Sequence, residues 1–331
     1  MRLVSSVSRL VALALLVSCS REATVEQVRA VVHPATSVGV ALDRRPVRAR
    51  PAKEHTAPPR RSERPAPRLA VSAPRRETTE LSQGTEDVTA ARLPNNGTIF
   101  AHGGGPLGRE SQRRLAELCQ HGDLVLIPTA NKDADKPRYR EFVRERWLSL
   151  GLASVSVVHA ETHERASAGP LVSRVRAAEC VWLGGGAQGP LVRRYRGTPI
   201  ERELFALLDR GGVVGGYSAG TSSLTEVMIR YGNPEPVAGR GFGLIGGVIF
   251  DQHFLVHRRE QRRLSVLEQF PELVGFGIDE GTALVIYGDR FEVVGESIVR
   301  RCTHQRGCVS LAPGATGRFP RGGSESSPPP P

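Results

Sequence analysis

The chain has 331 residues, with 45 lysines and arginines against 34 aspartates and glutamates, so its formal net charge is +11. Both ends differ in composition from folded protein, which leaves room for one folded domain between them. Part of the positive charge lies in an arginine-rich segment without aromatic residues to stack on bases, which argues against a nucleic-acid partner.

Residues 1–19 have the layout of an export signal. Arg2 gives a positive start, an apolar run covers 10–17, and the segment ends in Leu16-Val17-Ser18-Cys19. The apolar run is too short to span a membrane. Its ending resembles a bacterial lipobox, in which the cysteine is lipidated. We therefore expect a lipoprotein signal peptide with lipidation at Cys19. Ser20, where an aspartate would signal otherwise, favours the outer membrane, so the protein is expected to be exported and lipid-anchored to the cell envelope.

Residues 20–92 contain no aromatic residue and are dominated by Pro, Arg, Ala and Glu. Such a segment cannot bury enough apolar surface to offset the entropy lost on ordering. We predict a disordered linker over 20–92, a folded domain over 93–316, and a second disordered segment over 317–331, which is rich in Pro, Gly and Ser.

Between 93 and 316, strand-like apolar runs alternate with amphipathic helical segments. In chain order, the expected strands with their glycine turns are 97–105, 123–130, 154–160, 180–186, 213–217, 243–254, 272–280, 282–288 and 290–297. The expected helices are 110–122, 137–151, 169–179, 199–212, a short one after Ser218, and 259–270. This alternation predicts an α/β fold, a three-layer αβα domain with a mostly parallel sheet. The glycine turns at 103–105, 184–186 and 215–218 should converge on one crevice at the carboxyl ends of the strands.

Gly216-Tyr217-Ser218-Ala219-Gly220 fits G-x-S-x-G, the nucleophile elbow, and it follows an apolar strand as that motif requires. Glycines are needed because the turn forces the serine into an unfavourable backbone conformation with close neighbours. The serine hydroxyl is then exposed at a helix N-terminus, where the N–H of Ala219 can face an oxyanion. We predict that Ser218 is a nucleophile.

A general base is expected downstream, and His253, at the end of the run 243–254, is the best placed histidine. His102, at the first glycine turn, is its competitor. The carboxylate that orients the imidazole could be Glu226, Glu235 or Asp251, and spacing does not decide among them. An ordinary α/β-hydrolase esterase is disfavoured, because too few residues separate Ser218 from His253 for the usual strands and lid.

The remaining cysteines are assigned by context. Cys119 and Cys180 lie in apolar segments and are expected to be buried, unpaired side chains. Cys302 and Cys308 bracket a turn-like pentapeptide and are expected to form a local disulfide. A metal site is not expected, since only His304 is available as a further ligand there.

Several linked motifs resemble the cyanophycinase group of the S51 serine peptidases, relatives of dipeptidase E. They are GGYSAGTSSL, FDQHF followed by an arginine-rich helix, GFGIDEGTAL, LIPTAN and WLGGGAQ, and they extend from about Gly97 to Gly295. The resemblance implies a triad of Ser218, Glu235 and His253, and an oxyanion hole completed by the N–H of Gly186. It also implies substrate contacts from Gln188, Asp251, Gln252 and Arg262 or Arg263.

The resemblance further implies a serine exopeptidase that cleaves cyanophycin, multi-L-arginyl-poly-L-aspartate, to β-aspartyl-arginine through an acyl-enzyme and without a cofactor. Ala187 replaces an aspartate of the family pattern, and the segment between Glu235 and Asp251 is shorter. Two alternatives therefore remain: a hydrolase of short aspartyl peptides, and a non-catalytic surface lipoprotein that binds peptide or polymer. The expected partners are the substrate, the membrane through the lipid, and a second copy in a homodimer.

Overall fold

In the computed structural model of this chain, the residues described are 93–94, 96–120 and 122–320. All of them belong to the second of two compact units, Val71–Pro331. The expected signal peptide, the lipidation site Cys19 and the linker lie outside the described residues. Within the described segments, no helix is both long enough and apolar enough to cross a membrane.

The central sheet has the strand order β14-β11-β10-β1-β5-β4-β2-β3. The five neighbouring strands β1, β5, β4, β2 and β3 are parallel. On the other side of β1, the strands β10, β11 and β14 continue the sheet through antiparallel pairings. The strands are β1 (Thr98–His102), β2 (Asp123–Ile127), β3 (Ser154–Val157), β4 (Cys180–Leu183), β5 (Val213–Tyr217), β10 (Thr282–Tyr287), β11 (Arg290–Gly295) and β14 (Thr316–Arg318). The prediction of an α/β fold with a mostly parallel sheet is confirmed.

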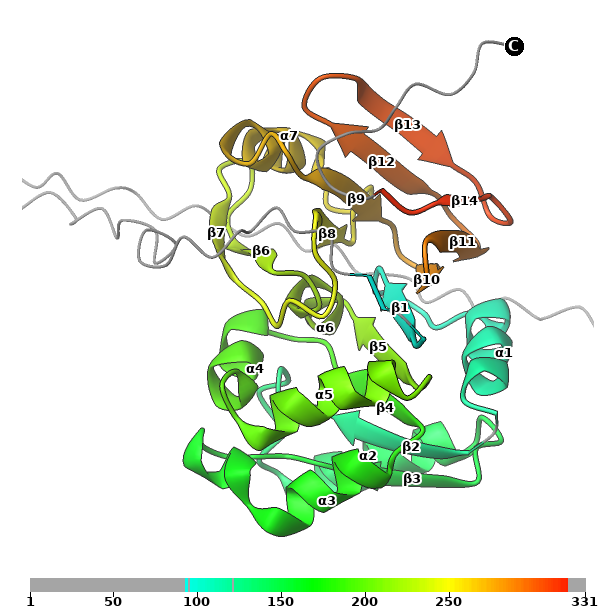
Figure 1. The fold of residues 1–331 in the computed structure, drawn as a ribbon, viewed down its shortest axis with the longest axis vertical. Coiled ribbons are helices and arrows are strands. Elements are labelled where there is room, and N and C mark those ends of the chain that lie inside the picture. The colour runs from blue at the N-terminus through cyan, green and yellow to red at the C-terminus, as the bar shows by residue number, and fades with distance from the viewer. Residues whose placement is uncertain (1–92, 95, 121, 321–331) are drawn as a thin grey trace, which may run out of the picture. The chain divides into compact units, whose positions relative to one another are not determined.

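Helices cover both faces of this sheet (Figure 1). They are α1 (Arg109–Leu118), α2 (Pro137–Leu148), a 3₁₀ helix η2 (Glu164–Ser167), α3 (Gly169–Ala177), α4 (Gln188–Tyr195), α5 (Pro199–Asp209), α6 (Ala219–Ser223) and α7 (Glu260–Gln269). Side chains alternate along β1, so that Phe100 packs in the cluster with α1 and α2, and Ile99 packs with α3, α4 and α5. These two apolar clusters make the three layers.

A second sheet, with the order β13-β12-β9-β8, was not anticipated as a separate unit. Its strands are β8 (Val248–Gln252), β9 (Val274–Ile278), β12 (Val299–Thr303) and β13 (Gly307–Leu311), and a hairpin of β6 (Val227–Tyr231) and β7 (Val237–Arg240) accompanies it. Phe250 and Phe276 of this sheet share a core with Ile286 and Phe291 of the large one. The two sheets are thus joined through apolar packing, and β8 and β9 run parallel.

The folded domain extends past the predicted boundary at 316. Residues 316–318 form β14, which pairs with β11. Phe319 is buried and stacks on Phe276 with ring centroids 5.5 Å apart. The expectation that 317–331 is disordered is therefore wrong for its first residues, because Phe319 gives this otherwise polar segment an apolar anchor.

Two disulfides are present. Cys302–Cys308 links β12 and β13, as expected. Cys119 and Cys180 are also bonded, with Cα atoms 5.7 Å apart, so the prediction that they are unpaired is wrong. The reason is tertiary: the end of α1 packs beside the start of β4 in one apolar cluster, across a sequence separation of 61.

Removing the Cys119–Cys180 bond should destabilise the domain more than removing Cys302–Cys308. The sequence separations are 61 and 6, so loop-closure entropy gives losses of about 4 and about 2 kcal/mol in the free energy of unfolding. Urea unfolding of the two double-alanine variants at one temperature measures both. Equal losses, or a larger loss for the Cys302→Ala/Cys308→Ala protein, would contradict this order.

Candidate active site

Ser218 lies at a sharp turn between β5 and α6, with backbone angles φ 52° and ψ −108°. This left-handed φ is unfavourable for a residue with a side chain, so its surroundings must hold it. Gly216 and Gly220 make that possible: a Cβ on Gly216 would lie 2.5 Å from the backbone nitrogen of Thr221, and one on Gly220 would lie 2.1 Å from the Leu183 oxygen. The steric reason predicted for these two glycines is confirmed.

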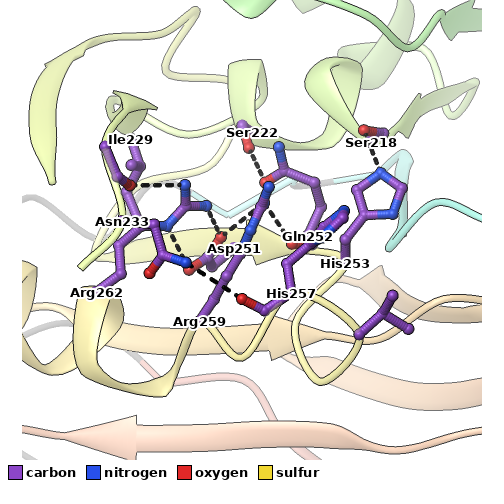
Figure 2. Close-up of polar contacts among 12 residues, drawn as sticks. Ser218, Ser222, Ile229, Asn233, Asp251, Gln252, His253, His257, Arg259 and Arg262 are labelled. Atoms are coloured by element: carbon purple, nitrogen blue, oxygen red, sulfur yellow. Dashed lines mark hydrogen bonds and ion pairs between the residues drawn. The ribbon is translucent and has the colours of Figure 1, made fainter. Parts of the chain in front are cut away.

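His253 holds the Ser218 hydroxyl. Its Nε2 is 2.7 Å from Ser218 Oγ, and Figure 2 shows this pair at one side of the group of polar contacts. His253 follows directly after β8, also with a left-handed φ of 49°. Its ring lies against Gly104, where a Cβ would be 2.2 Å from the ring carbon Cε1. The predicted serine and histidine are thus brought together by two different sheets.

The carboxylate on His253 belongs to Glu280. Its Oε1 is 2.6 Å from His253 Nδ1. In the parallel pairing of β8 and β9, Gln252 is opposite Ile278, so the residues that follow each strand, His253 and Glu280, emerge side by side. If Nδ1–H donates to the carboxylate, Nε2 is left to accept the Ser218 proton.

The predicted contact between Glu235 and the His253 imidazole is not observed. Glu235 is exposed in the turn between β6 and β7, and the structure gives its place on the imidazole to Glu280. The sequence did carry a signal for Glu280, because Asp279-Glu280-Gly281 follows an apolar strand. Recognising it requires knowing that this strand lies next to β8.

His102, the other histidine considered as a base, contacts the backbone of the turn at Ser218. It is completely buried, its carbonyl accepts the Ser218 N–H at 3.0 Å, and its Nδ1 accepts the Gly104 N–H at 3.1 Å. Burial, together with the nearby His253, lowers the pKa of His102 to about 4. This histidine is therefore neutral at physiological pH and does not contact the serine hydroxyl.

The two N–H groups expected to form an oxyanion hole lie near Ser218. Ala219 is the first residue of α6, and Gly186, in the turn after β4, lines the same cavity as Ser218. The Ala187 N–H donates to the Ala130 oxygen at 2.8 Å and holds this turn. A Cβ on Gly186 would lie 2.1 Å from the same oxygen, so only glycine fits there.

Asp251 and Arg262 are engaged with each other. Asp251 is completely buried, and its carboxylate accepts a hydrogen bond from Arg262 Nε at 3.1 Å and pairs with Arg259 at 3.4 Å. Arg262 also donates to the Gly232 oxygen at 3.1 Å. Figure 2 shows Asp251 and Arg262 on the side of the group away from Ser218. These contacts do not support the substrate-binding roles predicted for the two residues.

The other predicted substrate contacts are buried too. Gln188 donates to the Ile229 and Arg230 oxygens, and Gln252 accepts from Ser222 at 2.7 Å. Arg263 donates to the Arg300 oxygen and lies 4.1 Å above the Phe254 ring; burial lowers its pKa to about 10. None of these side chains is among the described residues that line the cavity at Ser218.

That cavity has a volume of about 950 Å³. Its walls come from the glycine turns after β1 and β4, as the sequence predicted, and from α2, which was not anticipated. The described lining residues include Gly105, Gly184, Gly185, Gly186, Tyr217 and Ser218, and from α2 Tyr139, Phe142, Val143, Arg146 and Trp147.

His253, His257 and Glu280 each have one atom that could ligate a metal, and within the described part of the chain these atoms lie within 4.8 Å of one another. Two of these three residues already have partners: His253 contacts the Ser218 hydroxyl through Nε2 and the Glu280 carboxylate through Nδ1. Their arrangement is that of a nucleophile, a base and an orienting acid.

A serine on a strained strand-to-helix turn, bonded to a histidine that a carboxylate orients, defines a serine-type hydrolase. Residues 102–294 match the profile of peptidase family S51. The chain belongs to this family.

Curated relatives include a cyanophycinase of Synechococcus elongatus, 27% identical over 59% of this chain and 64% of the relative. A cyanophycinase of Geminocystis herdmanii is 28% identical over 58% of this chain and 74% of its own. A peptidase E of Shewanella amazonensis is 26% identical over 61% of this chain and 86% of the relative. The crystal structure of a peptidase from an acI-B1 actinobacterium shares the fold, with a TM-score of 0.55, 24% identity, and coverage of 67% of this chain and 97% of that one.

Replacing Glu280 and Glu235 separately tests which carboxylate acts. Glu280→Gln should lower kcat for hydrolysis of an aspartyl peptide by about a thousand- to ten-thousandfold, because the imidazole loses its orienting charge. Glu235→Gln serves as the matched control, because the Glu235 side chain is exposed and both imidazole nitrogens of His253 contact other residues. This variant should change kcat by less than about twofold. The opposite pattern would return the role to Glu235.

Proposed function

We propose that Ser218, His253 and Glu280 catalyse peptide-bond hydrolysis through an acyl-enzyme. The continuous contact from Ser218 Oγ through the imidazole to the Glu280 carboxylate supports this most directly. A general base within hydrogen-bond reach of the nucleophile, itself held by a third group, is the arrangement that activates serine.

In the first half-reaction, His253 Nε2 takes the Ser218 proton while Oγ attacks the carbonyl carbon of the substrate. Collapse of the tetrahedral intermediate breaks the C–N bond, and the imidazolium returns its proton to the leaving amine. In the second half, His253 takes a proton from water, the hydroxide attacks the ester, and Ser218 leaves with the proton. The Glu280 carboxylate stabilises the imidazolium in both halves.

The oxyanion formed in each half-reaction would be held by the N–H groups of Ala219 and Gly186. The Ala219 N–H lies at the start of α6. Gly186 lies in the turn after β4, which is held by a hydrogen bond from the Ala187 N–H to the Ala130 oxygen. Donors held in this way before the reaction need not reorganise as charge develops.

For the substrate we propose cyanophycin, released as β-aspartyl-arginine by exopeptidase cleavage. Support comes from the relatives named cyanophycinase. This chain spans 64% of the first of them. Ala187, in place of the family aspartate, marks a difference beside the site.

Short aspartyl peptides are a second candidate, favoured by the cavity itself. Among its described lining residues, Arg146 and His253 are the groups able to carry a positive charge, and none is a carboxylate that could pair with an arginine side chain of cyanophycin. The relative named peptidase E, which this chain covers over 86% of its length, belongs with this candidate.

We also propose that the protein is exported and attached through Cys19 to the cell envelope. The two disulfides within the described domain support an oxidising compartment, since such bonds are rare in the cytosol.

Incubating the purified protein with cyanophycin and, separately, with Asp-X dipeptides tests the substrate. Cleavage of cyanophycin should yield β-aspartyl-arginine, identified by mass spectrometry. Ser218→Ala should lose activity on either substrate by about a millionfold, whereas Ser173→Ala, on the exposed face of α3, should keep it. Release of dipeptide by Ser218→Ala would overturn the proposal.

A further inference from the structure

The cations expected to bind substrate are not available to it. Arg262 is paired with Asp251. Arg263 is buried, its guanidinium lies over the Phe254 ring, and it donates a hydrogen bond to the Arg300 oxygen. A peptidase that selects acidic peptides needs a cation in its cavity, because an unpaired buried carboxylate is costly. If the substrate is acidic, another cationic residue must bind its carboxylate.

Arg146 is a cationic residue in a position to bind a substrate carboxylate. It lies in the last turn of α2 and lines the cavity that contains Ser218 and His253. Within the described residues its guanidinium has no carboxylate partner, in contrast to Arg144 on the same helix, which is paired with Glu141. An arginine that faces a cavity without a partner is well suited to bind a ligand carboxylate through two parallel hydrogen bonds.

The charge of Arg146 acts close to the nucleophile. Burial, and then the Glu280 carboxylate, raise the pKa of the Tyr217 phenol, and Arg146 opposes this rise. Tyr217 directly precedes Ser218. The charge of Arg146 therefore acts on Tyr217, which lines the same cavity as Ser218 and His253.

The wall beside Arg146 is aromatic. Tyr139, Phe142 and Trp147 of α2 line the cavity, and Phe142 is 60% exposed although it is apolar. Trp147 packs on Trp182 with ring centroids 5.0 Å apart, which fixes this part of the wall. Exposed aromatic surface inside a cavity favours an apolar side chain of the ligand.

We propose that Arg146 binds a free carboxylate of the substrate, and that the adjoining α2 wall receives an aromatic or aliphatic side chain next to it. This develops the second substrate candidate, short aspartyl peptides, in preference to cyanophycin: the preferred substrates are then short acidic peptides with an apolar side chain beside the carboxylate, such as Asp-Phe. This inference rests on the proposed peptidase function and specifies the substrate class of that site.

Binding to the Ser218→Ala protein tests this without depending on turnover. Asp-Phe, Asn-Phe and the amide of Asp-Phe differ only in their carboxylates, and calorimetry measures Kd for each. We expect Asp-Phe to bind at least about tenfold more tightly than at least one neutral analogue. Adding Arg146→Met should remove that difference, and Arg146→Lys should restore part of it.

Arg138→Met is the matched control, because Arg138 is exposed on the same helix and is not among the described lining residues. It should leave all three Kd values unchanged. Equal binding of the three peptides, no binding of Asp-Phe, or an undiminished preference in Arg146→Met would overturn the proposal. Failure of catalysis would show separately, as intact binding without Ser218-dependent hydrolysis.

Discussion

The backbone of Ser218, held at φ 52° and ψ −108°, is the constraint on which the rest of the site depends. A residue in this conformation persists only where its neighbours hold it more strongly than its own strain resists. Here Gly216 and Gly220 admit backbone from Thr221 and Leu183 at distances that no Cβ would allow. The buried His102 carbonyl accepts both the Ser218 N–H and the Thr221 hydroxyl. The turn is thereby fixed from both sides, and the hydroxyl points to His253.

The second sheet positions the histidine and the glutamate that act on Ser218. Because β8 and β9 are parallel neighbours, with Gln252 opposite Ile278, the histidine and the glutamate leave the same edge together. The large sheet positions the nucleophile, and the smaller one positions the base and its partner. The apolar core that contains Phe250, Phe276 and Ile286 joins the two sheets, and this packing holds Ser218 and His253 at the 2.7 Å distance between Oγ and Nε2.

The features predictable from sequence were those encoded by local patterns. The strand before Ser218, the glycines around it and the histidine after an apolar run each follow from a short stretch of residues. Glu280 and the Cys119–Cys180 bond do not, because each depends on two elements that are distant in sequence and adjacent in space. The same is true of Arg146, whose place in the cavity depends on where α2 crosses the sheet. Arg262 and Arg263 show the converse: motif resemblance suggested substrate contacts, but burial and the Asp251 charge engage them elsewhere.

The central claim is that His253 activates Ser218 as a nucleophile, and covalent labelling tests it without a known substrate. Treatment of the protein with a fluorophosphonate, followed by peptide mapping, should place one adduct on Ser218. His253→Ala should slow the labelling by about a thousandfold or more, because the serine then keeps its proton. A Ser218 that stays unmodified, or one that is labelled equally fast without His253, would contradict this account.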